Sequence, residues 1–273
     1  MYTINSTWLD ISKIADSGQC FRMNRIDDNM YRALAMDRLV YIQQVSVEEY
    51  ELFCTKKEYE SFWKNYLDMG TDYEEFSKDI PRSDKFLTRA SVYSKGIRIL
   101  RQDPWEMLIS FIISQRRSIP AIKTSIEKLC EKFGEKISDG RGGYCYAFPC
   151  AKRLATAELD DILACSVGYR AQYILEAARQ VASGAINLDA LQKLDDENLL
   201  KALMSIYGVG VKVANCIMLF GYHRIGAFPV DVWIQRMIDT HYDGHFPIEK
   251  YEGYAGVLQQ YIFFYGREMA RAK

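Results

Sequence analysis

The sequence predicts an α+β fold in which an antiparallel sheet comes first and helices come after it. Along residues 20–45 apolar and polar residues tend to alternate, as in strands that bury one face. From residue 103 onward the apolar residues instead recur every three or four positions, as on one face of a helix. With 273 residues, 49% of them hydrophobic and 26% charged, the chain can bury a sizeable core and is neither disordered nor fibrous.

Two polar interruptions, at residues 26–29 and 37–38, divide the alternating stretch into the strands of a meander. We expect helical structure to begin near residues 47–50, and residues 78–84 to connect this acidic part with the rest of the chain. Up to residue 88 the chain has 11 basic and 16 acidic residues, and beyond it 24 and 20. The sequence therefore predicts a first domain over residues 1–88 and a second over 89–273.

Four helices are predicted at the start of the second domain. Asp103 can cap the first of them, and the next runs from Ser118 to Gly134. Further apolar stripes predict a helix that ends before Gly184 and another over residues 196–204. Stripes of this kind are ordinarily core, so they assign no function.

A glycine-rich turn joins the helix over 196–204 to the next one. Gly208 and Gly210 flank Val209, and a helix starts directly at Val211. Backbone N–H groups at such a helix N-terminus are open to an anion such as a phosphate. The pattern predicts a helix-hairpin-helix over about residues 196–222, although the same turn can also be only a glycine cap between two helices.

Two residues near this turn carry the chemistry. Lys212 lies in the first turn of the new helix, where the helix dipole disfavours a cation. Asp231, within F-P-V-D-V, stands at the start of a further helix, where an aspartate is ordinarily a structural cap.

The chain resembles the 8-oxoguanine DNA glycosylases of the helix-hairpin-helix superfamily. The resemblance rests on G-V-G-V-K-V-A-N-C from Gly208, F-P-V-D-V from Phe228, and four further segments in family order, S-G-Q-C-F-R from Ser17, Q-D-P-W-E from Gln102, G-Y-R-A-Q-Y from Gly168 and Y-A-G-V-L-Q-Q-Y-I-F-F from Tyr254. It implies an N-terminal twisted antiparallel sheet domain and two helical subdomains with a DNA-binding cleft between them. No cysteine follows Cys216, so the iron-sulfur cluster of endonuclease III relatives is not expected, and we expect no cofactor and no metal.

The resemblance also implies a mechanism. Lys212 would attack C1′, release the oxidised base and form a Schiff base that permits β-elimination, while Asp231 would stabilise the charged sugar. The damaged nucleotide would leave the duplex and enter a pocket. There the Gly18 carbonyl would accept the N7–H of the oxidised purine, Gln259 would bind the Watson-Crick edge, and the side chains that sandwich the ring would be Phe263 and Cys216.

Further residues are expected to contact DNA by the same correspondence. These are Gly208, Gly210, Val211, Tyr169, Arg170, Arg116, Arg117 and Trp233. Arg116 and Arg117 replace asparagines of the family, and Ala121 stands where relatives have an arginine. Trp233 stands where the family often has a phosphate-binding histidine. We therefore expect the base opposite the lesion to be read less strictly than in relatives.

We expect the partner to be damaged double-stranded DNA, and the protein to be a monomer located in the cytoplasm with the chromosome. No apolar run approaches the ~20 residues of a membrane span, and we expect no signal peptide. The seven cysteines are scattered without a C-x-x-C pair, which argues against disulfides or a structural zinc. Two alternatives stay open, namely a glycosylase for another damaged purine and a non-catalytic helix-hairpin-helix protein, which would form no borohydride-trapped adduct.

Overall fold

The computed structural model describes residues 1–271, which form two units. The first unit consists of Met1–Arg32, Val40–Arg101 and the described chain from His223 onward. The second unit consists of Ala33–Leu39 and Gln102–Tyr222. The predicted domain division after residue 88 stays a prediction, and residues 272–273 of the predicted second domain lie outside the described chain.

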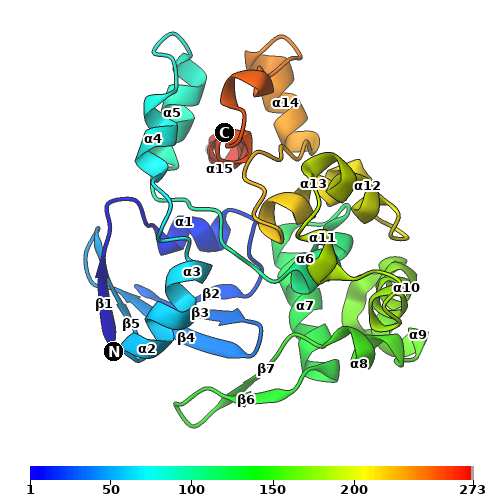
Figure 1. The fold of residues 1–273 in the computed structure, drawn as a ribbon. Coiled ribbons are helices and arrows are strands. Elements are labelled where there is room, and N and C mark those ends of the chain that lie inside the picture. Colours follow the sequence, from blue (N-terminus) through cyan, green and yellow to red (C-terminus); the bar gives the residue numbers. More distant parts are fainter. Residues whose placement is uncertain (272–273) are drawn as a thin grey trace. The chain divides into compact units, whose positions relative to one another are not determined.

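A five-stranded antiparallel sheet, with strand order β1-β5-β4-β3-β2, begins the fold (Figure 1). Its strands are β1 (Tyr2–Asn5), β2 (Met23–Asp27), β3 (Met30–Ala35), β4 (Arg38–Gln44) and β5 (Glu49–Leu52). The meander β2-β3-β4 turns at residues 28–29 and 36–37, in or beside the two polar interruptions of the sequence. The predicted antiparallel meander is thus confirmed.

The helix predicted near residues 47–50 is wrong, because this segment leads into β5. Tyr50 and Leu52 are fully buried while the glutamates between and before them are partly exposed, which is the period of a strand. β5 pairs with β1 on one side and with β4 on the other, so that Leu52 lies opposite both Tyr2 and Ile42. A strand of four residues is too short for its alternation to be recognised in the sequence, and one of its two partners, β1, lies far away at the start of the chain.

Several helices complete the first unit. They are α1 (Ile11–Asp16), α2 (Lys56–Glu58), α3 (Lys64–Tyr66), α4 (Tyr73–Lys78), α5 (Lys85–Tyr93), α14 (Val232–His241) and α15 (Ala255–Arg271), with the π-helical turn η1 (Tyr59–Trp63) and the 3-10 turn η3 (Ile248–Tyr251). The predicted connector over residues 78–84 ends where Asp84 caps α5 by accepting the Leu87 N–H at 2.8 Å. α15 packs against both α5 and α14.

The second unit is mostly helical. Its elements are α6 (Pro104–Ser114), α7 (Ile119–Phe133), β6 (Lys136–Ser138), β7 (Tyr144–Tyr146), α8 (Ala151–Ala155), α9 (Leu159–Ile162), the π-helical turn η2 (Leu163–Val167), α10 (Arg170–Ala182), α11 (Leu188–Leu191), α12 (Asp196–Met204) and α13 (Val211–Phe220). The predicted helices correspond to α6, α7, α10 and α12. No sequence pattern predicts the β6-β7 hairpin, which Figure 1 shows as the green ribbon beside α7 and α8.

α6 is the central helix of the second unit. The Asp103 carboxylate accepts the Glu106 N–H at 2.8 Å, which confirms the predicted cap. Every side chain from residue 107 to 113 is buried, and α6 packs against α7, α10 and α13. The start of α13, which carries Lys212, is therefore backed by the core of this unit. Among the described residues we find no helix with the length and hydrophobicity that a membrane span requires.

Candidate active site

The hairpin between α12 and α13 has the geometry of an open helix N-terminus. Gly208 has φ +86°, and a Cβ at this position would collide with the Tyr173 ring, so the turn requires glycine for two reasons. Its carbonyl accepts a hydrogen bond from Gln115 Nε2 at 3.1 Å. Gly210 caps α13 without any side-chain hydrogen bond, and Val211 is exposed. The first N–H groups of α13 are thus left to an external acceptor.

Lys212 comes next, in the first turn of α13, and is half-buried. Its Nζ lies 5.7 Å from the centroid of the Phe111 ring on α6. Among the described residues the amine forms no hydrogen bond and no ion pair, unlike Lys201 on α12, which pairs with Glu197 at 2.5 Å. Cys216 lies one turn further on the same face of α13 and is buried. The second unit therefore presents an amine with no competing partner at the open end of a helix.

Asp231 belongs to the first unit, where it caps α14. Its Oδ1 accepts the Ile234 N–H at 2.8 Å, which confirms the cap expected from the sequence. Among the described residues Oδ2 has no hydrogen-bond partner, and the residue is partly exposed. One oxygen thus fixes the carboxylate and the other is available. Beside it, Val232 and Trp233 are exposed at the start of α14, and Trp233 is a predicted DNA contact.

Gln259 and Phe263 lie one turn apart on α15, in the first unit. Gln259 is buried, its Nε2 donates to the Pro229 carbonyl at 3.0 Å, and its Oε1 accepts from Gln260 at 3.3 Å. The amide is therefore held by a residue that lies two positions from Asp231 in sequence. Binding to the edge of a base would require Gln259 to share or exchange these bonds.

The Gly18 loop is joined to the same helix. Arg267 Cζ lies over the Phe263 ring, 5.4 Å from its centroid, and Nη1 donates to the Asp16 carbonyl at 2.9 Å. Gly18 has φ +76° and is partly exposed. The structure thus connects three of the predicted pocket residues within the first unit.

The three arginines predicted to contact DNA differ in their surroundings. Arg170 is only 6% exposed and donates to the carbonyls of Gln115 and Val167. Arg117 donates to Ser125 Oγ and to the Ser166 carbonyl. Both guanidinium groups therefore hold backbone in place.

Arg116 is different, because its side chain is exposed and has no partner among the described residues. Its φ is +51°, a conformation that a non-glycine residue adopts rarely and that is found often at functional sites. Tyr169, at the start of α10, is 55% exposed. Arg116 and Tyr169 are thus the predicted contacts that the second unit leaves open to a ligand.

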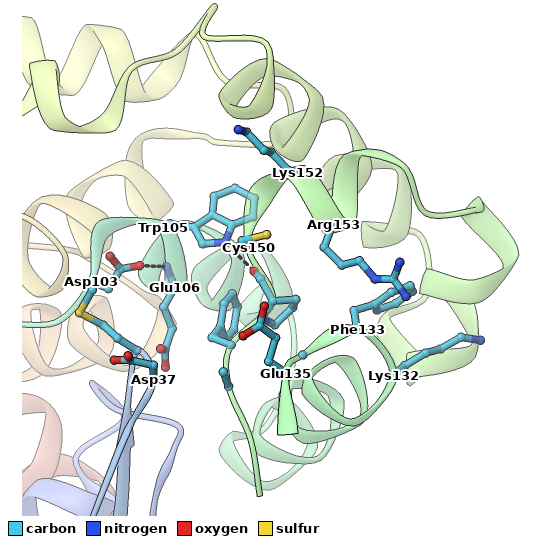
Figure 2. A pocket seen from close by; sticks show the side chains of 15 residues that line it. Asp37, Asp103, Trp105, Glu106, Lys132, Phe133, Glu135, Cys150, Lys152 and Arg153 are labelled. Atoms are coloured by element: carbon cyan, nitrogen blue, oxygen red, sulfur yellow. Dashed lines mark hydrogen bonds between the residues drawn. The ribbon is translucent and has the colours of Figure 1, made fainter. Parts of the chain in front are cut away.

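A cavity of about 860 Å³ lies elsewhere in the second unit (Figure 2). Trp105, Glu106, Phe133, Cys150 and Arg153 are among the side chains that line it. The Trp105 indole donates to the Pro149 carbonyl at 2.9 Å at its wall. None of the predicted site residues lines this cavity, so we assign it no part in the reaction. No group of three or more potential metal ligands comes together in the described chain.

Comparison with known proteins agrees with this geometry. Residues 1–108 match the N-terminal domain of 8-oxoguanine DNA glycosylase, and residues 109–245 match the HhH-GPD superfamily of base excision DNA repair proteins. The N-glycosylase/DNA lyase of Saccharomyces cerevisiae is 39% identical over 59% of this chain. That alignment spans 45% of the yeast enzyme, so the chain matches less than half of its length.

Two solved structures are similar over nearly the whole chain. MBOgg1 in complex with a low-affinity DNA ligand has a TM-score of 0.93 and 36% identity, covering 98% of this chain and 96% of that chain. The 8-oxoguanine glycosylase/lyase of Clostridium acetobutylicum, crystallised with double-stranded DNA containing cytosine opposite 8-oxoG, has a TM-score of 0.91 and 34% identity over 96% of this chain and 93% of its own.

The fold and the hairpin define a helix-hairpin-helix DNA repair protein of the base excision class. Within that class the chain belongs to the 8-oxoguanine DNA glycosylase family of N-glycosylase/DNA lyases. This confirms the family resemblance and the α+β fold predicted from the sequence. Membership of this family favours excision of 8-oxoguanine over the two alternatives left open by the sequence, which are a glycosylase for another damaged purine and a non-catalytic helix-hairpin-helix protein.

Proposed function

We propose that this chain excises 8-oxoguanine from damaged double-stranded DNA through Lys212 and Asp231, and then cleaves the strand. The observation that carries this assignment is the Lys212 amine, which forms no hydrogen bond or ion pair in the described chain and stands at the open N-terminus of α13. A lysine attacks through its free lone pair, so an amine that no carboxylate holds is suited to act as a nucleophile.

The chemistry needs Lys212 in its neutral form. Its Nζ lone pair attacks C1′ while the bond from C1′ to the base breaks, and the base leaves with the bonding electrons and takes up a proton. Asp231 Oδ2 stabilises the positive charge that grows on the sugar. Opening of the sugar ring then gives a Schiff base between Lys212 and C1′. Loss of a proton from C2′ breaks the C3′–O bond and releases the 3′ phosphate, which cuts the strand.

We assign the recognition of the flipped-out base to Gly18, Gln259 and Phe263, with Cys216 on the other side of the ring. The linkage of α15 to the Gly18 loop through Arg267 supports the grouping of the first three. Oxidation converts N7 of guanine from an acceptor to a donor, and the Gly18 carbonyl accepts only from the oxidised form. An unpaired buried polar group costs roughly 1–3 kcal/mol, so this contact alone favours 8-oxoguanine over guanine.

The remaining contacts are to the duplex. The uncapped N–H groups that come after Gly210 are suited to bind a phosphate, and the exposed Tyr169 ring is suited to fill the space that the flipped nucleotide leaves. Trp233 and Arg116 are further contacts in this proposal. The complex of the Clostridium relative with 8-oxoG-containing DNA supports it. We further propose that the protein acts as a monomer in the cytoplasm, with the chromosome.

Borohydride trapping on duplexes that carry different lesions tests the proposal. Wild-type protein should give a covalent adduct on 8-oxoguanine DNA and none on 3-methyladenine DNA. Lys212→Gln should abolish the adduct, whereas Lys201→Gln, which removes an exposed lysine of the same hairpin, should leave it unchanged. An adduct that persists in Lys212→Gln would assign the nucleophile to another residue. Equal trapping on 3-methyladenine would contradict the lesion assignment.

A further inference from the structure

The loop that carries Gly18 is held at its C-terminal side by the Gln19 side chain. Gln19 is fully buried, and its amide makes three hydrogen bonds. Nε2 donates to the Arg98 carbonyl at 2.9 Å and to Ser17 Oγ at 3.0 Å, and Oε1 accepts the Leu100 N–H at 2.9 Å. One side chain thus bonds two backbone groups of residues 98–100, much as a neighbouring strand would.

The segment 98–100 is itself fixed from other directions. The Ile99 N–H donates to the Tyr73 hydroxyl at 2.8 Å, and the Ile99 carbonyl lies 3.1 Å from His223 Nε2. The Tyr73 hydroxyl in turn donates to the buried Asp68 carboxylate at 2.8 Å. Gln19 is therefore anchored to backbone that a polar network holds rigid.

The N-terminal side of the loop is fixed as well. The Ser17 hydroxyl is fully buried and donates to the Ile14 carbonyl in the last turn of α1 at 2.8 Å. The Asp16 carbonyl accepts from Arg267 at 2.9 Å. Gly18 is consequently a partly exposed residue between Ser17 and Gln19, whose side chains are both held by buried hydrogen bonds.

From this geometry we propose that Gln19 is a positioning residue for base recognition, which sets the direction of the Gly18 carbonyl. The inference rests on the proposed function, in which that carbonyl accepts the N7–H of 8-oxoguanine. The Gly18 C=O and the Gln19 N–H lie in one planar peptide unit, so the backbone of Gln19 determines where the carbonyl points. A hydrogen bond weakens steeply once its angle falls toward ~120°, so a rotated peptide plane loses the contact that distinguishes the lesion.

Replacement of Gln19 by methionine keeps the length of the side chain and removes its hydrogen bonds. The Gly18 peptide plane then becomes free to rotate, while Lys212, Asp231 and α15 keep their places. We expect the preference for 8-oxoguanine over guanine to fall by about tenfold or more, the range that corresponds to one lost polar contact. Strand cleavage at a preformed abasic site involves no base, and it should stay at the wild-type rate.

The experiment measures equilibrium competition between duplexes with 8-oxoguanine or guanine at one position, in protein made inactive by Lys212→Gln. The same measurement is made after adding Gln19→Met. A matched control adds Tyr50→Phe, which removes a buried hydrogen bond of the same unit, from the Tyr50 hydroxyl to the Leu9 carbonyl at 2.7 Å. Cleavage of abasic-site DNA by the Gln19→Met and Tyr50→Phe single variants reports whether each remains folded and competent.

The expected result is lost discrimination with Gln19→Met, retained discrimination with Tyr50→Phe, and normal abasic-site cleavage with both. If the protein with both Lys212→Gln and Gln19→Met distinguishes the two duplexes as well as Lys212→Gln alone, the inference is wrong. If Lys212→Gln itself fails to distinguish the two duplexes, the base-reading role of Gly18 in the proposed function fails instead. If Gln19→Met does not fold, Ser17→Ala takes its place in the same measurement, because it removes the hydrogen bond from Gln19 Nε2 to Ser17 Oγ. The expected loss of discrimination between the two duplexes is then smaller.

Discussion

The two units hold their predicted site groups in different ways. In the first unit Gln259 is buried and bonded at both ends of its amide, and Asp231 uses one carboxylate oxygen as a helix cap. In the second unit the Lys212 amine and the Arg116 guanidinium form no hydrogen bond or ion pair with the described residues, and Tyr169 is mostly exposed, whereas Arg170 and Arg117 are bonded to backbone. Groups that read a base or stabilise a charge need a fixed direction, whereas a nucleophile must not be bonded to another partner when it attacks, and a side chain that contacts DNA must be exposed. Substitutions that remove the bonds of Gln259 or the cap of Asp231 should therefore cost stability as well as activity, whereas those at Lys212, Arg116 and Tyr169 should cost activity or affinity alone.

Lys212→Gln should give the largest effect and the clearest case for the second unit. Loss of the nucleophile should lower single-turnover excision of 8-oxoguanine by more than about a thousandfold. The melting temperature should stay that of the wild-type protein, because the amine forms no bond in the described chain. Duplex binding should survive, since in the proposed function the phosphate is bound by backbone N–H groups and not by the Lys212 amine. A large fall in melting temperature would mean that Lys212 has a structural role.

Two substitutions of Asp231, in the first unit, can separate its role as a helix cap from its proposed role in stabilising the charged sugar. Asp231→Asn keeps an oxygen for the Ile234 N–H but removes the charge, so excision should fall about 10²–10³-fold at nearly unchanged stability. Asp231→Ala should lose the same activity and also about 1 kcal/mol of stability, because α14 loses its cap. Excision rates and thermal unfolding of both variants measure the split. An Asn variant with normal activity per folded molecule would leave Asp231 only the role of a cap.

The sequence could predict those parts of the fold and site that depend on local signals. Asp103 before α6 and Asp231 before α14 are capping residues whose partners lie three positions on, and both caps are present. Gly208 is predictable as a turn residue because its neighbours in sequence form two helices. For the two caps the deciding atoms lie within one turn of the residue, whereas the close approach of the Tyr173 ring to Gly208 adds a second requirement that the local sequence does not show.

The sequence could not predict contacts made across long separations. Arg170 is expected from the sequence to contact DNA, yet its guanidinium is bonded to the Gln115 carbonyl, 55 residues away in sequence. The hydrogen bonds of Gln19 cannot be predicted from the sequence around it, since its partners Arg98 and Leu100 lie in a distant segment of the chain. Such roles depend on tertiary packing and not on a pattern in the chain.

A buried carboxylate at the centre of the first unit should show the stability side of the comparison. Asp68 accepts hydrogen bonds from Arg101 Nε at 2.7 Å, Tyr73 at 2.8 Å and Thr71 at 3.0 Å, and lies 3.3 Å from His223 Nε2. Burial by itself would raise the pKa of this carboxyl, but the hydrogen bonds from His223 and Tyr73 and the charge of Arg101 outweigh it and lower the pKa.

Asp68→Asn should therefore lower the free energy of unfolding by roughly 1.5–3 kcal/mol at pH 7. A folded-state pKa below the unfolded value of about 3.9 means that this stability is fully present above pH ~4 and is lost as the pH falls through the folded-state pKa. Denaturant unfolding at several pH values should show the gap between wild-type and variant closing below pH ~4. A gap that stayed constant there would mean that the charge of Asp68 is not its source.

The matched control is an exposed ion pair of the second unit. Lys132 and Asp161 lie 2.6 Å apart, but both side chains are substantially exposed. Such pairs contribute about 0–1 kcal/mol, so Asp161→Asn should change the free energy of unfolding far less than Asp68→Asn. Equal losses for the two variants would contradict the contrast between the units.

The smallest effect concerns the base opposite the lesion. Ala121 supplies no guanidinium, and those of Arg170 and Arg117 are bonded to backbone carbonyls, which leaves Arg116 as the open one of the three arginines. A guanidinium has hydrogen-bond donors only, so it can donate to O2 and N3 of cytosine or to a phosphate, but it cannot accept a hydrogen bond from the cytosine amino group.

We expect the preference for cytosine over adenine opposite 8-oxoguanine to be weaker by about tenfold or more than in family members that have the arginine, since one bidentate contact is typically worth roughly 1–3 kcal/mol. Arg116→Ala should then weaken binding to both duplexes by a similar factor and reduce the dependence of affinity on salt, as expected for a phosphate contact. Single-turnover excision and salt titration on duplexes that differ only in the opposite base measure both effects. If the wild-type protein rejects adenine strictly and Arg116→Ala accepts it, then Arg116 reads the base. The exposed Arg116 side chain of the second unit would in that case contribute to specificity as well as to affinity.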